Sequence, residues 1–189
     1  MLDPAPVTTL TDEDKIFQST VLRFVRERVA PHVRAMDEAA VFRQDLLKEM
    51  FELGLMGIEI PEESGGQGGT FFQSVLAIEA LATVDPSAAV IVDVQNTIAN
   101  NILLRWGNED QKGRYLPRLA ADTVASFALS EAGSGSDAFA LATRAVRDGD
   151  HFRITGRKSP SLKRWVTEIP SCCSWPLQKP GFSAGAPVV

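Results

Sequence analysis

The stretch from Pro86 to Trp106 constrains the fold most, because it is apolar on most sides of a helix. Asp85 followed by Pro86 is typical of a helix start, since the carboxylate can cap the first turn and proline lacks an N–H that this turn would leave unpaired. A helix that is apolar nearly all round is normally buried among other helices. The stretch therefore predicts the central helix of a bundle.

The same stretch does not suit a membrane. A transmembrane helix needs roughly 20 largely apolar residues. Polar side chains interrupt this stretch at Asp93, Gln95, Asn96, Asn100 and Asn101. We therefore expect a buried helix and no membrane span.

Other segments have the spacing of amphipathic helices. One is predicted to begin after Thr11, where three acidic residues suit the positive end of a helix dipole. Pro31 should kink or end it, with the pattern resuming as far as Met36. Its expected buried stripe is Phe17, Val21, Phe24, Val25 and Val29.

Three more helices follow from the same rule. The first buries Leu46, Leu47, Met50 and Leu53 and ends at Gly54, which suits a left-handed cap. The second begins at Thr70 and is predicted to bury Phe71, Val75, Ile78 and Leu81. The third runs from Glu109 to Ala121, with Pro117 inside it removing one backbone hydrogen bond.

Charge and ligand types exclude several functions. The formal net charge is −5, which offers no basic footprint for nucleic acid or anionic lipid. Cys172 and Cys173 are adjacent and can form neither a disulfide framework nor a spaced zinc site. His32 and His151 lack the spacing of metal ligands. We expect no metal site and no nucleic-acid partner.

After Asp122 the pattern changes from helix to strand. Three β-type runs are Val124–Leu129, Thr143–Arg147 and Phe152–Thr155, and Asp148-Gly149-Asp150 predicts a hairpin between the last two. The fold class is therefore α+β, with residues 1–122 as a helical domain and residues 123–158 as the opening of a β-domain. Residues 159–189 show no period of 2 or 3.6, so the β-domain is expected to remain incomplete after Lys158.

The loop from Ser126 to Asp137 is the strongest candidate site. Gly133 and Gly135 can take positive φ and let a ligand approach the backbone. Hydroxyls that can donate to a ligand lie at Ser130, Ser134 and Ser136. The alternative is an ordinary glycine-serine turn between strands. For Glu131, a structural carboxylate that binds backbone N–H groups is favoured over a catalytic base.

Taken in order, several motifs resemble those of the acyl-CoA dehydrogenase family over residues 10–158. They are Leu55–Ile58, Ser64–Gly66, Gly107–Lys112 leading into Tyr115–Pro117, Phe127–Asp137, Ala142–Ala145 and Ile154–Lys158. Ser130-Glu131-Ala132, together with Val94–Thr97, resembles the short/branched-chain type.

This resemblance implies a helical N-terminal domain, a barrel-like middle β-domain and a helical C-terminal domain, with FAD and the acyl-CoA thioester between them. The implied reaction is α,β-dehydrogenation of a short or branched acyl-CoA to the trans-2-enoyl-CoA, in fatty acid or branched-chain amino acid catabolism. Implied partners are an electron-transfer flavoprotein and three further copies in a homotetramer. The implied FAD contacts are Phe127, Ala128, Leu129, Ser130, Glu131, Ala132, Gly133, Ser134, Gly135 and Ser136. Ser136 also matches a position that touches the acyl-CoA.

The sequence departs from the family after Lys158, where Ser159–Trp165 stands in place of a flavin-contacting strand. The family's catalytic glutamate belongs to the C-terminal domain, so no catalytic residue is expected in this sequence. A truncated or frameshifted chain that is inactive alone is the leading interpretation. The alternatives are a non-enzymatic helical binding or subunit module, and a related acyl-CoA oxidase or flavin monooxygenase.

The first residues lack a transit peptide pattern. A eukaryotic source would imply the mitochondrial matrix and any other source the cytoplasm.

Overall fold

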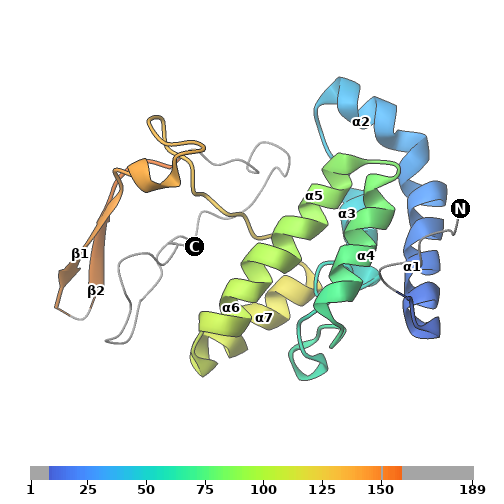
Figure 1. Ribbon diagram of the computed structural model, residues 1–189, viewed down its shortest axis with the longest axis horizontal. Helices are drawn as coiled ribbons and strands as arrows, with labels where there is room; N and C mark the ends of the chain where they lie inside the picture. The colour runs from blue at the N-terminus through green and yellow to red at the C-terminus, as the bar shows by residue number, and fades with distance from the viewer. Residues whose placement is uncertain (1–8, 150, 159–189) are drawn as a thin grey trace, which may run out of the picture. The chain divides into compact units, whose positions relative to one another are not determined.

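The computed structural model describes residues 9–149 and 151–158, in two compact units that divide between Thr123 and Val124 (Figure 1). The predicted tail 159–189 and Asp150 of the predicted hairpin turn lie outside the described residues. The helices of the first unit are α1 (Asp12–Phe24), α2 (Val33–Ala39), α3 (Gln44–Glu52), α4 (Phe71–Ala82), α5 (Pro86–Asp93), α6 (Asn101–Trp106) and α7 (Glu109–Ala121). The second unit contains β1 (Arg144–Asp148) and β2 (His151–Thr155). The α+β class is confirmed.

Helix α1 begins as the sequence predicts. The Thr11 hydroxyl accepts a hydrogen bond from the Asp14 N–H, and the Asp14 carboxylate accepts one from the Thr11 N–H, which completes a capping box. Val21 and Phe24 are buried, and Val25 and Val29 continue the buried stripe in a π-helical turn. The predicted kink at Pro31 is confirmed as a short 3-10 segment, after which the chain resumes in α2.

Helix α3 confirms most of its predicted buried side. Leu46, Leu47 and Met50 are buried, and Gly54 has a φ of 74° just after the helix. Leu53 was predicted to be buried and this was wrong, since 42% of its surface is exposed. The helix ends at Glu52, so the 3.6-residue period no longer directs the next side chain inward.

The predicted buried face of α4 is wrong in part. Phe71 and Val75 are exposed, whereas the side chains directed inward are Ser74, Leu76, Ala77, Ala80 and Leu81. Most of these are small, which lets the backbones of α4 and α5 approach closely. Figure 1 shows the two helices side by side, and many of their residues are in contact. Close packing, rather than the largest side chains, selects the inward face.

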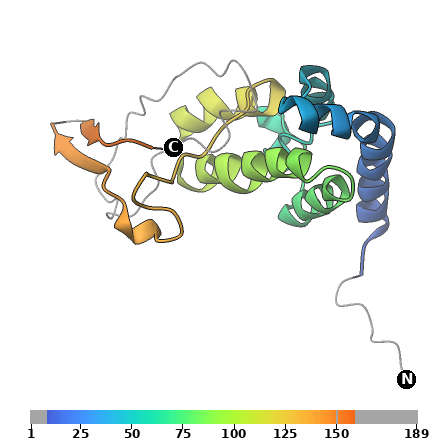
Figure 2. The same ribbon diagram turned by 90° about the horizontal axis from the view of Figure 1, so that it is seen from above.

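The predicted central helix is a continuous rod made of α5, a π-helical segment Val94–Asn100 and α6. In Figure 2, α1 runs across the direction of this rod. Its buried apolar side chains include Ala88, Ala89, Ile91, Val92, Ala99 and Leu103. Among the described residues, no helix combines the length and apolarity required to cross a bilayer.

Buried polar side chains of the rod bind an irregular segment at Leu55–Ile60. Asn96 donates to the carbonyl oxygen of Leu55 at 2.8 Å, and Asn100 donates to that of Met56 at 2.9 Å. The side chains of both asparagines are fully buried. A buried segment outside regular structure needs partners for its backbone groups, and the amides of the rod supply them.

The second unit contains an antiparallel hairpin. Its register pairs Arg144 with Thr155 and Asp148 with His151, and Gly149 has a φ of 61° in the turn. The prediction of a strand at Val124–Leu129 was wrong, because no described residue pairs with it as a strand. A β-prone sequence favours extended backbone, but a strand also needs a neighbour to hydrogen-bond.

Candidate functional site

The candidate loop is closed by its own backbone. The Glu131 N–H donates to the Ser134 carbonyl oxygen at 2.9 Å, and the Ser134 N–H donates to the Glu131 carbonyl oxygen at 3.1 Å. Ala132 and Gly133 form the tip between these two bonds. The loop is therefore a tight turn with a defined shape.

Two sequence expectations for this loop were wrong. Neither Gly133 nor Gly135 has positive φ, because the turn closes with ordinary backbone angles. The Ser134 side chain is buried and its hydroxyl donates to the Asp137 carbonyl oxygen at 2.6 Å. That hydroxyl stabilises the loop and is not directed to a ligand.

Glu131 is tied to the start of the hairpin. Its carboxylate accepts hydrogen bonds from the N–H groups of Ala142 at 2.7 Å and Thr143 at 3.1 Å, and it lies 2.8 Å from the Lys158 ammonium. The Lys158 ammonium, together with these N–H donors, lowers the pKa of the Glu131 carboxyl to about 2. A carboxylate held so firmly in its charged form is a poor proton acceptor near neutral pH. The structural role favoured by the sequence is the one observed.

Sequence reasoning missed the partners of Glu131. Ala142 and Thr143 lie 11 and 12 residues after Glu131, and Lys158 follows the second strand. A side chain at Gly156 would clash with Thr143, so this glycine lets the end of β2 lie close to the start of β1. A buried carboxylate needs a cation, but the sequence alone does not show that the Glu131 side chain is buried, so it gave no signal for Lys158.

The groups that remain available to a ligand are few. Ser130 and Ser136 are exposed, and in the described part of the chain their hydroxyls have no hydrogen-bond partner. The space around Gly133 and Gly135 is open. Two exposed hydroxyls beside an open backbone turn can donate hydrogen bonds to an anionic or carbonyl group. These features fit the polar edge of a ligand.

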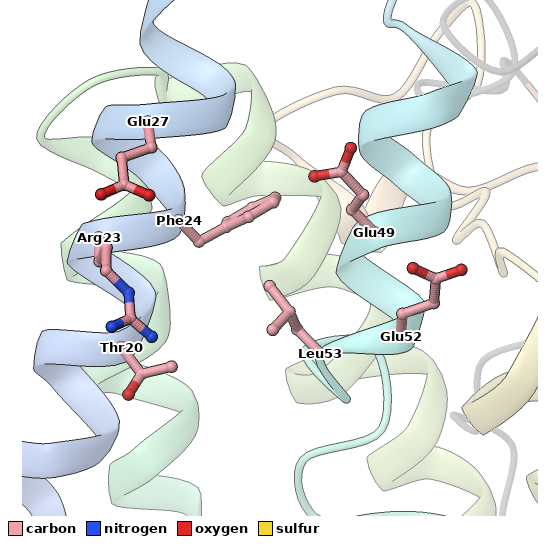
Figure 3. Close-up of a pocket in the computed structure, with 7 residues that line it drawn as sticks. All are labelled: Thr20, Arg23, Phe24, Glu27, Glu49, Glu52 and Leu53. Atoms are coloured by element: carbon pink, nitrogen blue, oxygen red, sulfur yellow. The ribbon is translucent and has the colours of Figure 1, made fainter.

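The first unit has an open groove of about 480 Å³ between α1 and α3, which the sequence did not predict. Figure 3 shows Phe24 and Leu53 directed into it from opposite sides. Arg28 binds Glu49 at its edge with two hydrogen bonds of 2.7 and 2.9 Å, and this arginine lowers the pKa of the Glu49 carboxyl. The described residues that line it are Thr20, Arg23, Phe24, Glu27, Glu49, Glu52 and Leu53. Within residues 9–149 and 151–158, no group of acidic, histidine or cysteine side chains could hold a metal ion.

Comparison with known proteins assigns the class. Residues 11–123 match the family model described as acyl-CoA dehydrogenase, N-terminal domain. The structure is similar to a glutaryl-CoA dehydrogenase from Mycobacterium smegmatis solved in complex with FADH2, with a TM-score of 0.72 and 33% identity. That match covers 78% of this chain and 38% of the other. The helical unit is thus the N-terminal domain of a flavoprotein fold.

The chain belongs to the acyl-CoA dehydrogenase family, whose members are oxidoreductases. It is 50% identical over 163 residues to a probable short/branched chain specific acyl-CoA dehydrogenase from Dictyostelium discoideum. It is 47% identical over 154 residues to the mitochondrial short/branched chain specific enzyme from Bos taurus. These matches cover 86% and 82% of this chain, which spans only 38% and 36% of the length of the two relatives.

Proposed function

We propose that this sequence is part of a FAD-dependent acyl-CoA dehydrogenase that oxidises a short or branched-chain acyl-CoA to the trans-2-enoyl-CoA. The observation that carries the proposal is the identity of 50% to a relative named for this substrate class, over 86% of the chain. The activity is assigned to the whole protein. Its metabolic place is fatty acid or branched-chain amino acid catabolism.

The loop 127–136 is the part of the chain that would contact the cofactor. The exposed Ser130 hydroxyl would donate a hydrogen bond to the polar edge of FAD, and the exposed Ser136 would contact both FAD and the acyl-CoA. Bound FAD supplies the acceptor for the hydride removed from the substrate. Glu131 does not act as the base, because its carboxylate already binds Lys158 and two backbone N–H groups.

The proposed partners are those implied by the family. An electron-transfer flavoprotein would accept the electrons, and the whole protein would form a homotetramer. The compartment follows the source of the gene: the mitochondrial matrix for a eukaryotic gene, in line with the mitochondrial relative from cattle, and the cytoplasm otherwise.

Ligand binding by the full chain tests this proposal. FAD is titrated into the purified chain and followed by flavin fluorescence, and 2-methylbutyryl-CoA is then added. Ser130→Ala should weaken FAD binding, and Ser136→Ala should weaken binding of both ligands, each up to about tenfold for one lost hydrogen bond. Ser19→Ala, which removes an exposed hydroxyl from α1, is the control and should change neither.

Failure of the wild-type chain to bind FAD would contradict the proposed cofactor site. Equal binding by wild type and by both loop variants would contradict the assignment of the two serines. Addition of a redox dye, with oxygen uptake measured in parallel, would separate a dehydrogenase from an acyl-CoA oxidase if turnover occurs.

A further inference from the structure

The Lys158 ammonium binds the groups on both sides of Ser130. It donates to the carbonyl oxygen of Leu129 at 2.9 Å and lies 2.8 Å from the Glu131 carboxylate. The residue between them, Ser130, is exposed. One cation thus fixes the positions immediately before and after a proposed ligand-contacting side chain.

The ion pair between Glu131 and Lys158 is largely shielded from water. The Glu131 side chain is 8% exposed and that of Lys158 is 24% exposed. Hydrogen bonds between charged groups are stronger when water is largely excluded. This distinguishes the pair from surface ion pairs such as Lys15 with Asp12, where the side chains are 60% and 94% exposed and little stabilisation is expected.

The remaining contacts of Glu131 extend this restraint to the hairpin. Its two oxygens accept from the N–H groups of Ala142 and Thr143, and Thr143 directly precedes β1. Lys158 follows β2 by three residues. The Glu131 carboxylate and the Lys158 ammonium therefore connect the loop to the residues just before β1 and just after β2.

We propose that Glu131 and Lys158 are positioning residues, which together hold the backbone at 129–131 so that the Ser130 hydroxyl faces FAD. This inference rests on the proposed function, because it names how the same loop is kept ready for its cofactor. The pair also cancels the carboxylate charge beside the loop. Without Lys158, Glu131 would repel the phosphate groups of an approaching cofactor.

An ion pair that only stabilised the fold would give a different result. Its loss would make the loop less ordered but would leave the FAD affinity of the folded molecules unchanged. A positioning pair instead couples the order of the loop to cofactor affinity, since a loop that must be ordered on binding lowers the affinity. The test therefore needs both measurements on the same variants.

The variants are Lys158→Met, which removes the ammonium, and Lys158→Arg, which keeps a cation. Lys112→Met is the matched control, because Lys112 pairs with Glu109 on α7 and its side chain is 31% exposed. Hydrogen exchange of the Ala142 and Thr143 amides is measured without ligand, and FAD affinity is measured by fluorescence. Circular dichroism verifies that each variant keeps its helices.

The expected result for Lys158→Met is exchange of the two amides faster by about tenfold or more, with FAD affinity lower by a similar factor. Lys158→Arg should keep most of the exchange protection and most of the FAD affinity. Lys112→Met should change neither the exchange rates nor the FAD affinity. Unchanged exchange in Lys158→Met would overturn the proposal, and so would faster exchange with unchanged FAD affinity. A wild-type chain that binds no FAD would instead overturn the proposed function, and with it FAD as the group that the pair serves.

Discussion

The side chain of Asn96 holds the backbone of Ile58, with its Oδ1 accepting a hydrogen bond from the Ile58 N–H at 3.0 Å. The same amide donates to the carbonyl oxygens of Leu55 and Val92 at 2.8 and 2.9 Å. It therefore joins the central rod to a buried segment that has no regular structure of its own. The N–H groups of Gln67, Gly68 and Gly69 also donate to carbonyl oxygens of this segment.

Asn96→Ala should destabilise the helical unit. The substitution leaves the Ile58 N–H and the Leu55 carbonyl buried without a partner, which should lower the free energy of unfolding by about 2–4 kcal/mol. Urea unfolding followed by circular dichroism measures this change. Gln44→Ala, which removes an exposed amide from the first turn of α3, is the control and should alter stability by less than about 0.5 kcal/mol. A change in Asn96→Ala as small as that of the control would contradict the role of this amide.

The two faces of α4 should respond very differently to substitution. Leu81 is fully buried, so Leu81→Ala should lower the free energy of unfolding by about 2–5 kcal/mol. Phe71 is 53% exposed. Phe71→Ser should therefore lower the free energy of unfolding by much less than Leu81→Ala does, although it removes more apolar surface. Thermal unfolding of the two variants gives the comparison. A cost of Phe71→Ser as large as that of Leu81→Ala would return Phe71 to the buried face that the sequence spacing predicted.

Helix positions could be predicted from the sequence because their signals are local. Thr11, Thr70 and Asp85 each cap a helix as their residue types indicate, and Glu109–Ala121 is helical over its whole predicted length despite Pro117. A cap is set by bonds within one turn, so no knowledge of distant residues is needed.

The features that sequence could not supply depend on distant partners. Helix α4 packs against both α5 and α1, and Ala77 and Ala80 are buried there whereas Phe71 is exposed. Pairing of Asn96 with Ile58, or of Glu131 with Lys158, joins residues far apart in the chain. Neither the 3.6-residue period nor residue type reveals such partners. The composition of the sequence pointed to the candidate loop but did not predict the shape of that loop.

Gln95→Leu should loosen the end of α7. The fully buried Gln95 amide donates to the carbonyl oxygens of Leu119 at 3.1 Å and Thr123 at 3.0 Å, groups that the helix end leaves without a partner of its own. Loss of both bonds should lower the free energy of unfolding by about 1–3 kcal/mol. Hydrogen exchange of the Asp122 and Thr123 amides should quicken more than that of the Asp14 amide in α1. Equal changes at both places would point to global destabilisation alone.

The contacts of Glu131 should survive mild acid. Its pKa is lowered from 4.5 to about 2, chiefly by the Lys158 ammonium, so the folded state binds the proton more weakly than the unfolded chain does. The stabilisation is therefore complete above about pH 5 and is lost as the pH falls from there toward about 2. Exchange protection of the Ala142 and Thr143 amides, corrected for the intrinsic rate, should persist at about pH 4 and disappear near pH 2. Glu131→Gln should lack this transition, because its amide does not titrate. A loss of protection in the wild type with a midpoint near 4.5 would show that Lys158 does not hold the carboxylate in its charged form.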